Sequence, residues 1–150
     1  MSDLEKRLEA LVQPLLEERG LVLVDLELKG VGNRKILRVY IDKEGGVTLR
    51  DCEDLSREFS VLLDIEDPIE GSYILEVSSP GADRVLKKER ELRWAVGKEV
   101  QVTTAQGRVV GTLRQVEDEA LTIETPDGPL RLPREEIQVI RLYMKEVERE

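Results

Sequence analysis

The spacing of apolar residues changes at the segment Ser78-Ser-Pro-Gly81, and this change constrains the fold more than any other feature of the chain. Before the segment, two stretches with helical spacing are interleaved with three strand-like stretches. After it, most of the chain consists of short strand-like stretches separated by turn residues. Pro80 and Gly81 are typical of the second and third positions of a type II turn. The sequence therefore predicts two structural parts joined at this turn.

The chain begins with a predicted helix. Leucine and valine recur at helical spacing over residues 4–16, which gives one apolar stripe on an otherwise polar helix. Ser2 and Glu5 have the spacing of a capping box, and Gly20 favours the end of the helix. Pro14 lies inside the stretch, where we expect it to kink or loosen the helix.

A second helix is predicted over residues 49–63. Thr48 precedes it as the N-cap, and Asp51 occupies the third helical position of a capping box. Cys52 lies within the apolar stripe of this helix. We therefore interpret it as a core residue and not as a reactive thiol.

Three strands complete the first part. Residues 21–28 and 34–42 flank turn residues and predict a hairpin, and residues 73–77 predict a third strand. The order helix, strand, strand, helix, strand can bury one face of the sheet beneath both helices. The fold class predicted for the first part is an αββαβ two-layer sandwich within an α+β protein.

The second part predicts a small barrel of SH3-like or Sm-like type. A short helical turn over residues 89–96 comes first, and we expect it to tuck Trp94 against one of the two domains. Five short strands follow, at residues 99–103, 108–116, 120–125, 130–132 and 137–142. The predicted domains are 1–83, a basic linker 84–97, and 98–150 with a charged tail.

Charge is distributed unevenly along the chain. Residues 1–83 contain 10 basic and 19 acidic residues, a net charge of −9, whereas residues 84–150 contain 13 of each. The window 84–98 holds six basic residues against the two acidic residues Glu89 and Glu91. An acidic first part would repel bare nucleic acid and suit a basic protein partner. From local chemistry alone, a plain turn followed by solvated charges is the favoured explanation of the window.

Composition excludes several functional classes. The chain has no histidine and one cysteine, so we expect no catalytic site, metal or other cofactor. Aromatic residues are only 3% of the chain, which argues against a stacking platform for single-stranded bases. No apolar run approaches the length of a membrane span, and the N-terminus lacks the features of a signal peptide. We expect a cytoplasmic protein with no membrane association.

Several strings in one order resemble the ribosome maturation factor RimP family, and the resemblance covers most of residues 1–100. They are Leu37-Arg-Val-Tyr-Ile-Asp42, Gly45-Gly46-Val47, Asp51-Cys52, Leu63-Asp64, Asp67-Pro68-Ile69 and Leu75-Glu-Val-Ser-Ser-Pro-Gly-Ala-Asp-Arg84. Two positions depart from the pattern, because Ala82 and Val85 stand where the family more often has leucine and proline. We therefore expect a less rigid exit from the turn.

The resemblance implies a non-enzymatic assembly factor that binds the immature 30S ribosomal subunit. The expected partners are small-subunit ribosomal RNA and a basic ribosomal protein, bound by a monomer. Candidate contacts to ribosomal RNA are Arg84, Lys87, Lys88, Arg90, Arg93, Lys98, Arg108 and Arg114. The candidate domain-junction turn comprises Ser78, Ser79, Pro80, Gly81 and Asp83. The alternatives are a general RNA-binding Sm-like module and a protein-interaction adaptor.

Overall fold

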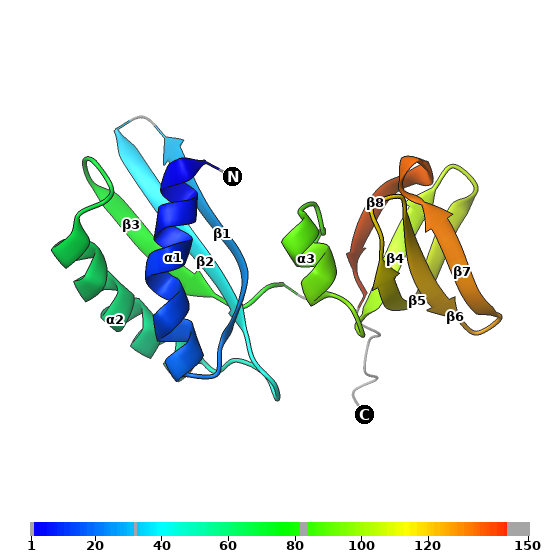
Figure 1. Ribbon diagram of the computed structural model, residues 1–150, viewed down its shortest axis with the longest axis horizontal. Coiled ribbons are helices and arrows are strands. Elements are labelled where there is room, and N and C mark those ends of the chain that lie inside the picture. Colours follow the sequence, from blue (N-terminus) through cyan, green and yellow to red (C-terminus); the bar gives the residue numbers. More distant parts are fainter. Residues whose placement is uncertain (1, 32, 82–83, 144–150) are drawn as a thin grey trace, which may run out of the picture. The chain divides into compact units, whose positions relative to one another are not determined.

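The computed structural model describes residues 2–31, 33–81 and 84–143 (Figure 1). The chain divides into two compact units, Met1–Pro80 and Gly81–Glu150, and each has its own hydrophobic core. The first unit combines two helices with a three-stranded sheet, and the second contains a five-stranded antiparallel sheet with a short helix. The α+β class and the αββαβ order predicted for the first part are confirmed.

The first helix, α1 (Asp3–Glu18), begins at the predicted capping box. Ser2 Oγ accepts a hydrogen bond from Glu5 N at 3.1 Å, and Glu5 Oε1 accepts one from Ser2 N at 3.2 Å. The helix continues across Pro14 to its last turn, and Gly20 follows with a φ of +66°. A left-handed glycine just after the last turn is a common helix end, because glycine has no Cβ to oppose it.

The second helix, α2 (Leu49–Glu66), also begins at its predicted capping box. Asp51 N donates to Thr48 Oγ1 at 3.1 Å, and Thr48 N donates to Asp51 Oδ2 at 2.9 Å. Cys52 is half-buried against the first core, and burial raises the pKa of its thiol. The interpretation of Cys52 as a packing residue is confirmed.

The sheet of the first unit has the order β1-β2-β3. Strands β1 (Val22–Val31) and β2 (Arg34–Asp42) form the predicted antiparallel hairpin, whereas β3 (Tyr73–Ser78) runs parallel to β2. A parallel neighbour needs a crossover connection, which α2 supplies. Because β3 ends the strand order, it is an edge strand of this sheet among the described residues.

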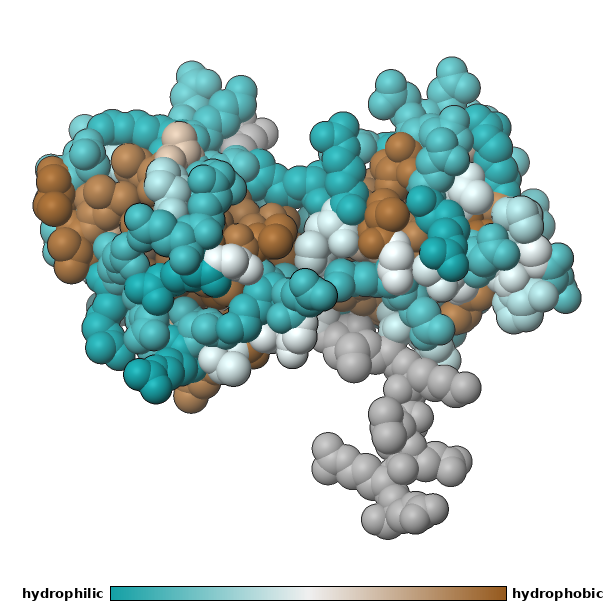
Figure 2. Space-filling view, turned by 60° about the horizontal axis from the view of Figure 1, so that its bottom comes forward, coloured by the Kyte–Doolittle hydropathy of each residue, from teal (hydrophilic) through white to brown (hydrophobic). Residues whose placement is uncertain are grey.

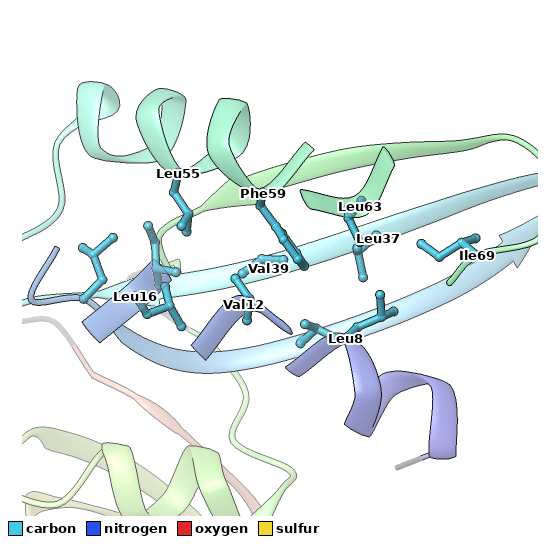
Figure 3. Close-up of a cluster of buried hydrophobic side chains, with 12 residues drawn as sticks. Leu8, Val12, Leu16, Leu37, Val39, Leu55, Phe59, Leu63 and Ile69 are labelled. Atoms are coloured by element: carbon cyan, nitrogen blue, oxygen red, sulfur yellow. The ribbon is translucent and has the colours of Figure 1, made fainter. Parts of the chain in front are cut away.

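The core of the first unit lies between the helices and one face of the sheet. Figure 3 shows side chains of α1 and α2 pointing toward those of β2. The labelled residues are Leu8, Val12, Leu16, Leu37, Val39, Leu55, Phe59, Leu63 and Ile69. Nearly all are fully buried, with Leu63 and Ile69 exposed by 1% and 3%. The apolar stripes of α1 and α2 therefore pack against alternate residues of β2, and helices and sheet form two layers.

The second unit is built on one antiparallel sheet in the order β7-β6-β5-β4-β8. Its strands are β4 (Glu99–Thr104), β5 (Gly107–Val116), β6 (Ala120–Thr125), β7 (Gly128–Pro133) and β8 (Ile137–Leu142), with the 3₁₀ turn η1 (Arg134–Glu136) before β8. All five strands were predicted. Over residues 84–143, β7 and β8 are the two ends of the strand order, so closure into a barrel stays a prediction.

The predicted basic linker packs against the second sheet. Its short helix is α3 (Glu89–Trp94), and Leu92 is part of the second core. Leu86 N donates to Ile140 O at 2.8 Å, so the segment before the helix lies along the edge of β8. Trp94 packs against the same core, which confirms that it tucks against one of the two domains.

A close approach between β5 and β6 yields a stability prediction. A Cβ atom on Gly111 would lie 2.4 Å from Glu124 O and 2.7 Å from Ile123 Cγ2. We expect Gly111→Ala to lower the free energy of unfolding of the second unit by about 1–3 kcal/mol, because backbone atoms must move. Denaturant unfolding followed by the fluorescence of Trp94, the one tryptophan in the chain, measures this cost. An unchanged free energy of unfolding of the second unit in Gly111→Ala would refute the explanation.

The capping box of α2 predicts a pH dependence. Lys43 Nζ lies 2.8 Å from Asp51 Oδ2, and this contact, followed by the bond from Thr48 N, lowers the pKa of Asp51 from 3.8 to about 2. Because the pKa is lower in the folded chain, the stabilisation is present above about pH 4 and is lost as the pH falls toward about 2. Thermal unfolding should show Asp51→Asn less stable than the natural chain at pH 5 and equally stable near pH 2. A constant difference across this range would contradict the prediction.

Candidate nucleic-acid interface

A buried carboxylate organises the basic segment that starts the second unit. The side chain of Glu91 is 3% exposed, and its Oε2 accepts a hydrogen bond from Arg84 Nε at 2.7 Å. Its Oε1 accepts from the backbone N–H groups of Lys87 and Lys88 at 3.3 and 3.1 Å. Glu91 is the third residue of α3, so it satisfies backbone donors at the start of that helix as the acidic member of a capping box does.

This arrangement separates Arg84 from the other candidate contacts. The Arg84 side chain is only 15% exposed and is committed to Glu91. Removing a charge from water is costly, and the attraction between two buried partners offsets that cost. Arg84 therefore fixes the geometry of the segment in this structure instead of presenting its charge to solvent.

The side chains of Lys87 and Arg93 are exposed, Lys87 before α3 and Arg93 within its last turn. Lys88, the N-cap residue of α3, and Arg90, in its first turn, are half-buried. Four cations thus fall within one stretch of seven residues, 87–93. Phosphate oxygens are natural ligands for such a group of ammonium and guanidinium ions.

Lys98 extends this basic stretch beyond α3. Its Nζ lies 4.9 Å from the centre of the Trp94 ring, a geometry in which a cation is attracted to the ring face. The backbone around Lys98 is fixed as well, because Gly97 N donates to Leu113 O at 2.7 Å and Leu113 N donates to Lys98 O at 3.0 Å. These bonds join the end of the basic stretch to β5.

The remaining candidate cations lie on β5. Arg114 directly follows Leu113, whose backbone is hydrogen-bonded to Gly97 and Lys98. Arg108 lies near the other end of β5, about 20 Å away along the strand. Both side chains are exposed. The structure thus brings Arg114 near the Lys98 end of the basic stretch and leaves Arg108 apart from it.

A second ion pair fixes α3 to the turn before β8. Both terminal nitrogens of the Arg134 guanidinium donate to the Glu89 carboxylate, with Nη2 at 3.2 Å from Oε2. Arg134 Nε donates to Glu117 O at 2.8 Å. The hydrogen bond from Arg134 lowers the pKa of Glu89, and the same bond raises the pKa of Arg134. Both acidic residues of the basic window therefore have structural partners within the second unit.

The predicted domain-junction turn lies at the division between the units. Ser78 ends β3, Ser79 and Pro80 follow, and Gly81 begins the second unit. Gly81 O accepts a hydrogen bond from Arg84 N at 3.2 Å. Two residues of this region, Ala82 and Asp83, lie outside the described residues, so the type II turn stays a prediction.

Sequence reasoning did not anticipate the role of Glu91. Its position three residues after Lys88, at the start of a helix, was the available indication, because an acidic residue there often accepts bonds from backbone N–H groups. The partner of Glu89 was not predictable, since Arg134 lies 45 residues away in the sequence.

Two other features, a metal-binding group and a membrane-spanning helix, are absent from the described parts of the chain. Over residues 2–31, 33–81 and 84–143, no group of three or more acidic, cysteine or histidine side chains could hold a metal ion. In the same ranges no helix has the length and apolar character needed to cross a membrane. The basic stretch 87–98 is thus the candidate site that the second unit offers.

The comparison with known families identifies the first unit. Residues 11–83 match the family model described as the RimP N-terminal domain. The matched range begins within α1 and includes every strand of the first sheet. The strings that carry the resemblance in the sequence fall largely within this range.

The buried ion pair predicts strong energetic coupling between Arg84 and Glu91. We expect Arg84→Met to lower the free energy of unfolding of the second unit by about 3 kcal/mol, because it leaves the Glu91 carboxylate buried without its cation. In a Glu91→Gln background the same change should cost much less, since no charge is left unpaired. Trp94 fluorescence during denaturation measures all three variants. Equal costs of Arg84→Met in both backgrounds would show that the pair does not act as a unit.

Proposed function

Since the chain belongs, through residues 11–83, to the RimP family, we propose that it is a non-enzymatic assembly factor for the 30S ribosomal subunit. It binds immature particles through small-subunit ribosomal RNA and a basic ribosomal protein. The family match is the observation that carries this proposal. The charge distribution supports it, because an acidic unit and a basic stretch suit different components of one ribonucleoprotein particle.

The contacts to ribosomal RNA are made by Lys87, Lys88, Arg90, Arg93 and Lys98, with additional contacts from Arg108 and Arg114 on β5. Arg84 acts through Glu91, by fixing the start of α3, and does not touch phosphate itself. Contacts of this kind are few and electrostatic, so binding is salt-sensitive and reversible. Reversibility suits a factor that must leave the particle before translation.

The acidic first unit meets the basic ribosomal protein. Its net charge of −9 over residues 1–83 attracts a cationic partner and opposes unwanted contact with RNA. The second sheet closes into a small SH3-like or Sm-like barrel that supports the basic stretch. The protein acts in the cytoplasm as a monomer and needs no cofactor.

Charge reversal in the basic stretch tests this proposal. Lys87→Glu combined with Arg93→Glu changes two exposed side chains, and Lys6→Glu combined with Arg7→Glu makes the same change on the exposed side of α1. We expect the first pair to weaken binding to purified free 30S subunits by about tenfold and to reduce the slope of log affinity against log salt by about 1–2. The control pair should leave the slope unchanged. Sedimentation binding at several salt concentrations gives both quantities.

Three results would contradict the proposed function. Equal binding to complete 70S ribosomes and free small subunits would exclude an assembly factor. Equal affinity for unrelated RNAs would favour a general RNA-binding module. Binding that does not depend on salt would favour a protein-interaction adaptor, because phosphate contacts release counterions.

A further inference from the structure

The outer edge of β3 is open to a further strand. Among the described strands, only β2 pairs with β3. Lys35 N donates to Ser72 O at 3.4 Å, so the backbone groups of even-numbered residues face β2. Because these directions alternate along a strand, the N–H and C=O groups of Tyr73, Leu75 and Val77 point away from β2. Unpaired groups in a row are a template for pairing with another chain.

The sheet edges elsewhere in the described chain carry features that β3 lacks. At the edge of β1, Leu28 N donates to Glu5 Oε2 of α1 at 3.2 Å. The edge of β8 is covered by the segment that contains Leu86. On β7, Pro129 and Pro133 have no N–H group to donate. β3 has neither a proline nor a covering segment within the described residues, so its edge is the one suited to a partner.

A groove of about 550 Å³ runs beside this edge, between β3 and α2. Leu75 and Val77 of β3 line it together with Leu49 and Cys52 of α2. Leu49 is 76% exposed although it is apolar. Alternate side chains of an added strand would point toward α2 and enter the groove, and these positions suit apolar residues. Hydrophobic patches are visible on the surface of both units among hydrophilic residues (Figure 2).

The negative charge of the first unit favours a basic occupant of the groove. Two exposed carboxylates, Glu53 and Glu76, and one cation, Arg57, also line it, and Glu76 is paired with Arg38 Nε at 3.0 Å. The surrounding unit carries a net charge of −9 over residues 1–83. An extended segment with basic side chains on its solvent-facing positions is attracted to this surface, whereas an acidic segment is repelled.

We propose that the edge of β3 and the adjoining groove bind an extended basic peptide segment as a fourth strand, with its alternate apolar side chains in the groove. Backbone hydrogen bonds to Tyr73, Leu75 and Val77 supply affinity, and the groove supplies specificity. The assignment of this segment to a ribosomal protein rests on the proposed function. The mode of binding rests on the edge, the groove and the charge.

The first test uses a synthetic peptide and the full chain. A short peptide of alternating lysine and valine should bind, and amide exchange at Leu75 and Val77 should slow when it does. Peptides of alternating glutamate and valine, or of lysine and proline, should bind at least about tenfold more weakly, because one has the wrong charge and the other lacks N–H donors at alternate positions. Equal binding of all three peptides would overturn the proposal.

Matched variants locate the site. Glu53→Lys combined with Ser56→Arg adds positive charge and bulk to the groove, and Glu44→Lys combined with Gln13→Arg makes the same change at exposed positions elsewhere on the unit. The groove pair should weaken peptide binding at least about tenfold, a loss that corresponds to about 1.4 kcal/mol, and the control pair less than about twofold. Equal effects would show general attraction to an acidic surface and overturn the proposal.

Two further outcomes separate this inference from the proposed function. Peptide binding to the groove without any binding to 30S subunits would refute the proposed function and leave the strand-addition site standing. Binding to 30S subunits that the groove pair does not weaken would refute the assignment of the segment to a ribosomal protein. Dimerisation that depends on protein concentration and is lost in the groove pair would overturn the proposal in favour of a second copy of the chain.

Discussion

The hydrogen-bonded ion pair between Glu91 and Arg84 is the interaction on which the organisation of the basic segment depends. One carboxylate oxygen holds the guanidinium, and the other accepts two backbone N–H groups at the start of α3. A short helix gains little stability by itself, so tertiary contacts of this kind decide whether it forms. The buried negative charge of Glu91 therefore contributes to the positions of the cations on α3.

This arrangement gives the basic residues of the window two distinct roles. Arg84 is an internal partner, whereas the other cations of the window are exposed or half-buried. The sequence suggests one uniform basic cluster, but burial divides it. Arg84 has a structural role, and the other cations form a second part that solvent can reach. Only the second part has the access that phosphate contacts require.

The elements of the fold were largely predictable from the sequence because their determinants are local. The helix starts at Ser2 and Thr48 follow from capping boxes whose members are three residues apart. The strands β2, β6 and β8 have the predicted bounds, since their apolar runs end at turn or polar residues.

The features that the sequence did not reveal depend on distant partners. The burial of Arg84 requires Glu91 to fold back from α3, and the bond between Glu89 and Arg134 joins residues far apart in the chain. The open edge of β3 depends on strand order, which periodicity does not encode. Local patterns therefore identify elements, and tertiary contacts decide which charges and edges stay accessible.

Hydrogen–deuterium exchange of the full chain, free and bound to purified small subunits, tests the central claim most directly, because it reports both proposed contact surfaces in one measurement. The claim is that the basic stretch 87–98 and the edge of β3 contact different components of the same particle. The account predicts slower exchange on binding over α3 and at Leu75 and Val77, with β7 unchanged. Protection confined to β6 and β7, or no change anywhere in the presence of the subunit, would contradict it.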